Sequence, residues 1–391
     1  MKITLTLLAA LLLPVFATAK PLPAANKPEL ALNAPGQAPK LAARAYVLYD
    51  FTTGQTLHQH NSHERIEPAS LTKLMTAYLT FSALRQDKLS LSQKITPSNY
   101  AVRAQRSESR LFLERGKSVS IDELLRGLII VSANDAARAL AETLADNEAA
   151  FAELMNREAQ RLGMSDTHFV NSTGLPDPLH YSSAYDLALL SAAIINEFPE
   201  HFPLYSHRDF EFNNIKQYNR NRLLWQDPTV DGMKTGHTES AGYSLVATAK
   251  RGNHRLISVV LGTTSEHLRS AESQRLLNHG FQDFDIYYLY KKNETISKIR
   301  LWKGTENTVK AGIRDGLTLT LPKGQRELLK ATIETQQPLL APIGDGQQLG
   351  VLRLTLDGKP YMEFPLVALE PVALVNIFSR GIDSIRMMFS E

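Results

Sequence analysis

A serine and a lysine three residues apart, Ser70 and Lys73, form the first candidate reactive pair in the sequence. Residues three apart share one face of a helix, so the lysine amine can lie against the serine hydroxyl. That hydroxyl is a good nucleophile only when a base removes its proton. Lysine becomes such a base beside a second cation and at the positive end of a helix, where its ammonium form is disfavoured. We expect Lys234 to be the second cation, and the pair predicts nucleophilic catalysis.

Two more motifs follow, each present once in the chain: Ser132-Ala133-Asn134 and Lys234-Thr235-Gly236. Taken alone, the first is an ordinary helix N-cap and the second an ordinary basic turn. Taken together with the Ser-x-x-Lys pair, and in this order, they indicate one site. Ser132 is then suited to relay a proton to a leaving amine, and Asn134 to hold a substrate amide.

The Lys-Thr-Gly motif predicts the binding of a free carboxylate. Lys234 supplies a cation and Thr235 a hydroxyl, while Gly236 permits a close approach of the substrate backbone. An oxyanion needs two backbone N–H groups. We expect those of Ser70 and His237 to supply them.

Longer stretches around these motifs resemble the low-molecular-mass penicillin-binding proteins, the D-alanyl-D-alanine carboxypeptidases of the penicillin-binding protein 5 and 6 type. The matching stretches are PASLTKLMTAY, VSANDAARALAE, HYSSAYDLALLSAAII, NRNRLLW, VDGMKTGHTESAGYSLVATAKR and AESQRLLNHG. The resemblance extends over nearly the whole chain. It implies Ser70 as the acylated nucleophile, Lys73 as the acylation base and Ser132 as the proton shuttle.

The same resemblance implies a substrate, inhibitors and binding residues. Peptidoglycan stem peptides would be substrates and β-lactams covalent inhibitors, with no cofactor. The residues implied to hold the substrate are Asn134, Lys234, Thr235, Arg269 and Arg220. His180 stands in a stretch that resembles the family, but the sequence assigns it no role.

Helices and strands must bring these motifs together. Helical spacing of apolar residues predicts helices over 70–84, 121–129, 135–144, 148–162, 183–196 and near 270–278. Strand patterns occupy 45–50, a second piece after the Thr53-Gly54 turn, 243–249 and 256–262. The Lys-Thr-Gly motif lies just before one of them, where an edge strand could bind a peptide. The fold class is α+β, with the first and last strands sharing a sheet packed by helices; the resemblance implies a β-lactamase/transpeptidase-like sheet.

The pattern changes after residue 283. The region 41–283 is predicted to be the penicillin-binding serine peptidase domain, whereas 284–370 alternates apolar and polar residues between Gly-containing turns and predicts a small all-β domain. Residues 371–391 form an amphipathic pattern with too many charges to span a membrane. We expect this helix to lie on a membrane surface, weakly and reversibly; docking on the β domain's own core is the alternative.

The N-terminus predicts export. Lys2 precedes an apolar run of about 14 residues, short of the roughly 20 that cross a bilayer, and Ala17-Thr18-Ala19 forms a small-x-small pattern. We expect a signal peptide over 1–19, a flexible Pro- and Ala-rich leader over 20–40, and a peripheral protein at the periplasmic face of the inner membrane.

Composition excludes several functions. The 43 basic and 40 acidic side chains are too balanced, and too free of basic blocks, to indicate nucleic acid. The absence of cysteine excludes disulfides, thiolate metal sites and a lipidated cysteine, and the eleven histidines show no metal-binding pattern. The sequence leaves open whether the chain forms a homodimer.

Three other functions compete with the carboxypeptidase. A β-lactamase needs a second carboxylate for deacylation, but the Glu-x-x-Leu-Asn pattern is missing, Glu153-Leu154-Met155-Asn156 is wrongly spaced, and the middle motif is not Ser-Asp-Asn. A DD-endopeptidase of peptidoglycan cross-links is disfavoured by the extra domain and terminal helix. A non-catalytic cell-wall binding protein is disfavoured by the intact motifs.

Overall fold

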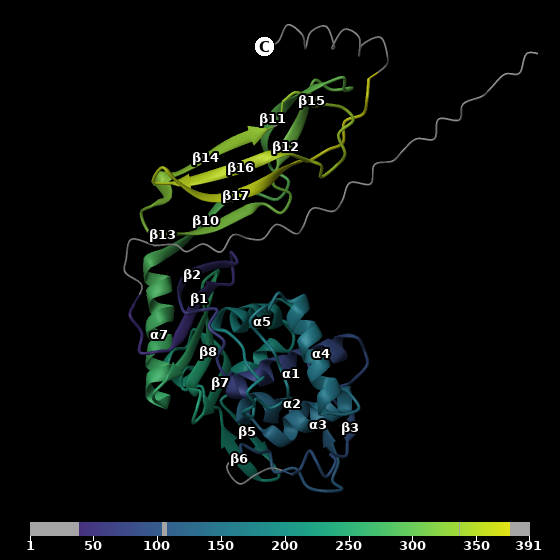
Figure 1. Ribbon diagram of the computed structural model, residues 1–391, viewed down its shortest axis with the longest axis vertical. Helices are drawn as coiled ribbons and strands as arrows, with labels where there is room; N and C mark the ends of the chain where they lie inside the picture. The colour runs from purple at the N-terminus through teal and green to yellow at the C-terminus, as the bar shows by residue number, and fades with distance from the viewer. Residues whose placement is uncertain (1–38, 104–107, 336, 376–391) are drawn as a thin grey trace, which may run out of the picture.

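The computed structural model describes residues 39–103, 108–335 and 337–375. Over these residues the chain forms a helix-and-sheet part that ends at Asp283 and a β-rich part that begins at Phe284 (Figure 1). The two parts follow one another along the longest axis of the molecule, with the β-rich part at the top of the view.

Three predicted segments fall wholly or mostly outside the described residues: the signal peptide, most of the leader and most of the C-terminal helix. The helix predicted over 371–391 is wrong at its beginning. Val372 is buried and forms an isolated β-bridge with Ile343, so residues up to Val375 belong to the β-rich part. In the part of the chain that the structure describes, no helix has the length and apolar character needed to cross a membrane.

One antiparallel sheet of five strands, in the order β2-β1-β9-β8-β7, organises the helix-and-sheet part. The strands are β1 (Ala45–Asp50), β2 (Gln55–His60), β7 (Val230–Thr238), β8 (Gly242–Arg251) and β9 (His254–Thr263). Pairing of β1 with β9 confirms that the first and last strands share the sheet. Strand β7 lies at one edge.

Helices cover both faces of this sheet (Figure 1). Side chains alternate along a strand, so Val47 of β1 packs into the core beneath the central helical block, while Leu48 packs beneath α7 (Glu266–Asp283). The central block contains α1 (Lys73–Arg85), α2 (Ile121–Arg126), α3 (Asn134–Leu144), α4 (Glu148–Arg161) and α5 (Ala184–Glu197). The six helices predicted between residues 70 and 278 are all present, and α7 is longer than the sequence indicated.

Short elements join this framework. They are η1 (Ala69–Thr72), β3 (Lys94–Ile95), β4 (Val119–Ser120), the π-helical turn η2 (Gly127–Val131), η3 (Phe202–Ser206), β5 (Asp209–Phe212), β6 (Ile215–Tyr218) and α6 (Leu223–Gln226). The β5–β6 hairpin was not predicted from the sequence. Its turn, Asn213-Asn214, has φ of 50° and 60°, and two such residues in a two-residue loop are typical of a hairpin.

The β-rich part confirms the prediction of an all-β region. Strand β10 (Phe284–Tyr290) follows α7 directly and pairs with β13 (Leu317–Pro322). A second sheet has the order β14-β16-β17-β12-β11-β15. Its strands are β11 (Thr295–Trp302), β12 (Thr308–Gly312), β14 (Leu329–Thr335), β15 (Leu339–Leu340), β16 (Gln348–Leu356) and β17 (Lys359–Ala368); one helical turn, η4 (Arg326–Leu328), precedes β14.

Thr320 of β13 connects the two parts. Its hydroxyl donates to the buried carboxylate of Asp50 at 2.5 Å. Its backbone N–H and C=O both bond to the side-chain amide of Gln55, at 2.8 and 3.1 Å. A buried side chain thus satisfies both backbone groups of a neighbouring strand, which fixes the β-rich part against the β1–β2 hairpin.

Candidate active site

Ser70 and Lys73 come together at the start of α1. Ser70 lies in the tight turn η1, and Lys73 is the first residue of the helix. The Lys73 ammonium nitrogen Nζ lies 3.1 Å from Ser70 Oγ and donates to the Thr173 carbonyl at 2.6 Å. Only 1% of Lys73 is exposed. The contact that the three-residue spacing predicted is present.

The pKa of Lys73 is lowered to about 7, mainly by burial and in smaller part by the nearby positive charges of Arg138 and Arg220. Glu108 and Asp135 act in the opposite direction. At neutral pH a large fraction of the amine is therefore unprotonated and able to accept the Ser70 proton. The sequence predicted Lys234 as the second cation. In the structure Arg138 and Arg220 are the cations that lower the Lys73 pKa, while burial and the repulsion between Lys73 and Lys234 lower the Lys234 pKa.

Ser132 and Lys234 form a second serine–lysine contact. Lys234 Nζ donates to Ser132 Oγ at 2.8 Å and to the Thr235 carbonyl at 3.1 Å. Burial, followed by the charge of Lys73, lowers the pKa of Lys234 well below its usual value. Ser132 has a left-handed backbone, φ 65°, directly after the π-helical turn η2. Such backbone features are concentrated at functional sites, since surrounding structure must hold them in place.

Asn134 begins α3 and contacts Glu108, a residue that was not predicted from the sequence. Its Nδ2 donates to Glu108 Oε2 at 2.7 Å, and Arg138 Nη2 donates to the same oxygen at 2.8 Å. Glu108 lies in a polar stretch without a recognisable pattern, so no sequence signal marks it. Arg138 follows Asn134 by four residues on one helix face, which is the one available hint.

The Lys-Thr-Gly motif lies within β7 rather than in a loop before a strand. A Cβ atom on Gly236 would lie 2.9 Å from the Pro68 carbonyl oxygen and 3.1 Å from Leu71 Cγ. Glycine therefore allows β7 to pack closely against η1, which is a different reason from the substrate approach predicted. The exposed His237 ring stacks on Tyr243, with ring centroids 3.9 Å apart.

Arg269 and Arg220 meet at one end of the site. Arg269 is 3% exposed, pairs with Glu266 at 2.9 Å and donates to the Arg220 carbonyl at 3.4 Å. Its guanidinium also lies over the Tyr243 ring, 5.6 Å from the centroid. The Arg220 side chain is exposed. These arginines bring positive charge to the end of the site where the sequence predicted carboxylate binding.

His180 now has a structural role. Its Nδ1 accepts the Val170 N–H at 3.1 Å, so the neutral ring carries its proton on Nε2, which donates to Thr72 Oγ1 at 2.8 Å. Burial lowers the His180 pKa to about 4, which keeps the ring neutral. The bond links η1 to the segment that carries the Thr173 carbonyl.

These groups surround one cleft of about 410 Å³. Its walls are Ser70, Glu108, Ser109, Ser132, Asn134, Thr173, Gly174, Leu175, Arg220, Thr235, Gly236, His237, Thr238, Glu239 and Arg269. Lys73 and Lys234 lie behind the wall and reach it through Ser70 and Ser132. The structure thus brings every predicted site residue to this one place.

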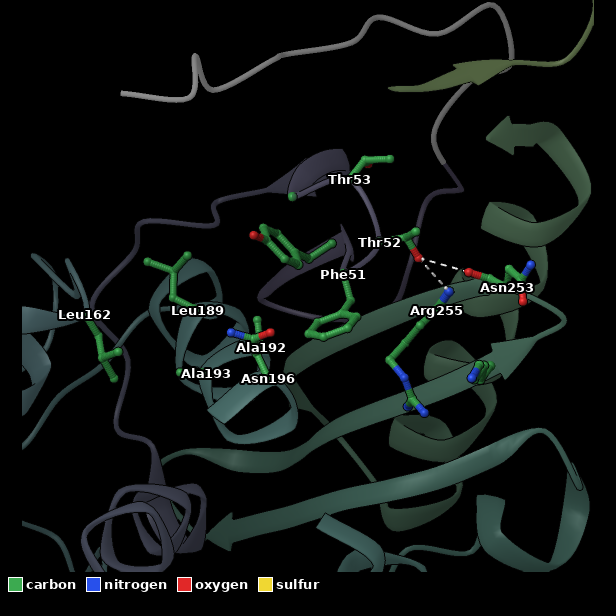
Figure 2. Close-up of a pocket in the computed structure, with 13 residues that line it drawn as sticks. Phe51, Thr52, Thr53, Leu162, Leu189, Ala192, Ala193, Asn196, Asn253 and Arg255 are labelled. Carbon is green, nitrogen blue, oxygen red and sulfur yellow. Dashed lines mark hydrogen bonds between the residues drawn. The ribbon is translucent and has the colours of Figure 1, made fainter. Parts of the chain in front are cut away.

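A larger hollow of about 590 Å³ lies elsewhere, between the β1–β2 turn, α5 and the β8–β9 turn. Figure 2 shows Thr52 at its edge, bonded to the backbones of Asn253 and Arg255. The Arg255 guanidinium already pairs with both oxygens of Asp231 at 2.7 Å. No nucleophile–base contact is found among the described residues that line it. The smaller cleft, which contains the Ser70–Lys73 contact, is therefore the better candidate for the active site.

A helix-flanked antiparallel sheet with a Ser–Lys pair at a helix start defines a serine hydrolase. Comparison with known proteins narrows this class. Residues 33–265 match the D-alanyl-D-alanine carboxypeptidase family, and residues 284–373 match the C-terminal domain of penicillin-binding protein 5. The chain belongs to the D-alanyl-D-alanine carboxypeptidase family.

Individual relatives are similar over most of their length. The chain is 40% identical to the D-alanyl-D-alanine carboxypeptidase DacC of Escherichia coli, over 91% of this chain and 90% of that one. The solved penicillin-binding protein 5 of Haemophilus influenzae is 42% identical, with a TM-score of 0.83 over 86% of this chain and 98% of that chain. Penicillin-binding protein D2 of Listeria monocytogenes, solved with ampicillin bound, is 33% identical, with a TM-score of 0.57 over 62% of this chain and 98% of that chain.

Proposed function

We propose that this chain removes the terminal D-alanine from peptidoglycan pentapeptides through an acyl-enzyme on Ser70. The observation that carries the proposal is the 3.1 Å contact between Ser70 Oγ and a buried lysine whose pKa is lowered to about 7. β-Lactams would acylate the same serine, because they present a strained amide beside a carboxylate.

Acylation begins when neutral Lys73 takes the proton of Ser70 Oγ, which attacks the carbonyl carbon between the last two D-alanines. The backbone N–H groups of Ser70 and His237 are the candidates for stabilising the oxyanion. Ser132 then relays the proton that Lys73 took to the leaving amine as the C–N bond breaks, and free D-alanine departs. Water hydrolyses the ester and regenerates Ser70.

The cationic end of the cleft supports recognition of the substrate's free carboxylate. Thr235 would contact it directly and Lys234 would supply positive charge from behind the wall, with Arg269 and Arg220 beside them. An arriving carboxylate would favour the protonated form of Lys234, because it offsets the burial and the neighbouring cations that lower this pKa. Asn134 would hold a backbone amide of the same peptide.

A β-lactamase remains disfavoured on chemical grounds. The cleft-lining carboxylates within the described residues are Glu108 and Glu239. The Oε2 atom of Glu108 already accepts from Arg138 and Asn134. Glu239 lies at the end of β7, directly after Thr238, the last residue of that strand.

Mass spectrometry of a pentapeptide incubated with the protein tests the proposal. We expect loss of one D-alanine, and we expect penicillin to add its mass covalently to the intact protein. Ser70→Ala should abolish both signals. Cleavage of cross-linked peptides alone would indicate an endopeptidase, and an undiminished penicillin adduct on Ser70→Ala would refute the assignment.

The cellular location of the protein is also a proposal. The signal-peptide pattern supports export, and the amphipathic pattern that follows Val375 supports peripheral attachment to the periplasmic face of the inner membrane.

A further inference from the structure

Glu108 brings a carboxylate into the cleft wall although it belongs to none of the three sequence motifs. Its side chain is 6% exposed and that of its partner Arg138 is 8% exposed. The Oε2 atom accepts from Asn134 Nδ2 at 2.7 Å and from Arg138 Nη2 at 2.8 Å. Arg138 also donates through Nη1 to the Arg103 carbonyl at 3.2 Å. One oxygen therefore joins a predicted substrate-binding amide to a fixed guanidinium.

A buried ion pair of this kind is weak support for stability. The loss of hydration by both charges can exceed their attraction, and apolar replacements of similar size are often as stable. The position of the pair beside the substrate-binding residue therefore favours a role in the site over a role in folding.

The Glu108 carboxylate determines which way the Asn134 amide is turned. An ionised carboxylate can only accept hydrogen bonds, so the Asn134 amide must turn its nitrogen, not its oxygen, toward Glu108. That nitrogen carries two hydrogens, and Glu108 takes one. The other remains for a carbonyl oxygen in the cleft.

We propose that Glu108 is a positioning residue that orients the Asn134 amide, so that its second N–H receives an amide carbonyl of the substrate. Glu108 then determines preference for ligands that carry such a carbonyl. This inference rests on the proposed function, because it assumes that acylation takes place in this cleft.

A second effect of Glu108 must be separated from this one. Its negative charge also raises the pKa of Lys73, so its removal alters the activation of Ser70. That effect applies equally to every acylating ligand at a given pH. A ratio between two ligands, one with an amide carbonyl and one without, cancels it.

The experiment compares the second-order rate constants of acylation by benzylpenicillin and by penicillanic acid, the same bicyclic lactam without the amide side chain. We expect Glu108→Ala to lower the benzylpenicillin-to-penicillanic-acid ratio about tenfold, the effect of one misoriented hydrogen bond. Glu108→Gln should keep most of the ratio, because its amide oxygen still accepts from Asn134. Asn134→Ala should lower the ratio as much, and adding Glu108→Ala to it should lower it no further.

The outcomes are distinguishable. If Glu108→Ala slows both lactams equally, or if the two substitutions have additive effects, the inference is overturned. If Glu108→Ala does not fold, the pair Glu108→Leu with Arg138→Met leaves no unpaired buried charge and should show the same lowered ratio; an unchanged ratio there also overturns it. If the wild-type protein is acylated by neither lactam, the proposed function fails instead.

Discussion

At the scale of single residues, the site depends on where protons and charges are held. Lys73 is buried, donates to the Thr173 carbonyl and contacts Ser70, so its amine has a fixed direction and a lowered pKa. The arginines Arg269 and Arg220 form a second group, in which Arg269 pairs with Glu266 and lies over the Tyr243 ring. The first group activates the nucleophile and the second would bind the substrate.

The charge of Arg269 can be tested by substitution. We expect Arg269→Ala to lower kcat/KM for peptide cleavage roughly 10–100-fold, because a charged hydrogen bond to the terminal carboxylate is lost. Acylation by penicillin should fall less, since carboxylate capture serves the peptide most. Steady-state kinetics with both ligands measures this. Arg275→Ala, on the same helix but with a side chain that is 57% exposed, is the matched control; equal losses with both ligands for Arg269→Ala would count against the role.

At the scale of elements, the turn η1 must meet both β7 and the segment 170–175. Gly236 allows β7 to approach η1, and Gly174 allows the other segment to do so. A Cβ on Gly174 would lie 1.8 Å from the Ala69 carbonyl oxygen, and Gly174 also has φ of +83°. Asn171 Oδ1 accepts from the Gly174 N–H at 2.7 Å, which holds this segment in its tight conformation.

Gly174→Ala should therefore lower the free energy of unfolding by roughly 3 kcal/mol or more, because steric overlap adds to backbone strain. Gly163→Ala has the same left-handed strain, at φ +79°, but nothing within 4 Å of the new Cβ, so a loss of about 1 kcal/mol is expected. Denaturant unfolding of both variants measures these free-energy losses. Similar losses would show that close packing at Gly174 does not matter.

Some of these elements were predicted from the sequence and others were not. Helix α1 and strands β1, β8 and β9 were visible because their apolar spacing is regular. Strand β7 was not predicted, because Lys234, Thr235 and Gly236 within it break the apolar spacing that marks a strand. Contacts such as Lys73 with Thr173, or Asn134 with Glu108, join residues through tertiary structure alone, and no local pattern encodes them. The reactive pair was predictable because both partners lie on one helical turn.

At the scale of the whole molecule, a β-rich part is fixed to the catalytic part through Thr320, Asp50 and Gln55. The described structure ends at Val375, on the β-rich part, which lies at the opposite end of the molecule from α2 and α3 (Figure 1). The proposed attachment through the segment that follows Val375 would therefore act on the β-rich part. Buried Val372 shows that a truncation should begin after Val375.

Deletion of residues 376–391 should release the protein from anionic vesicles and leave its turnover in solution unchanged, because the apolar helix face is removed without disturbing the β-rich core. Sedimentation with vesicles measures binding. Phe389→Asp, on the predicted apolar face, should weaken binding, whereas Ser384→Asp, on the polar face, should weaken it less. Unchanged sedimentation of the truncated protein would contradict the membrane proposal.

The pH dependence of acylation tests the central claim most directly. The base form of Lys73 grows as pH rises through its pKa, so the rate constant for acylation of Ser70 by benzylpenicillin should increase with pH and level off above about 7. Lys73→Ala should lower this rate by roughly 10²–10⁴ and remove the inflection. A rate that continues to climb toward the usual pKa of lysine, or that does not change across neutral pH, would contradict an unprotonated Lys73 as the base.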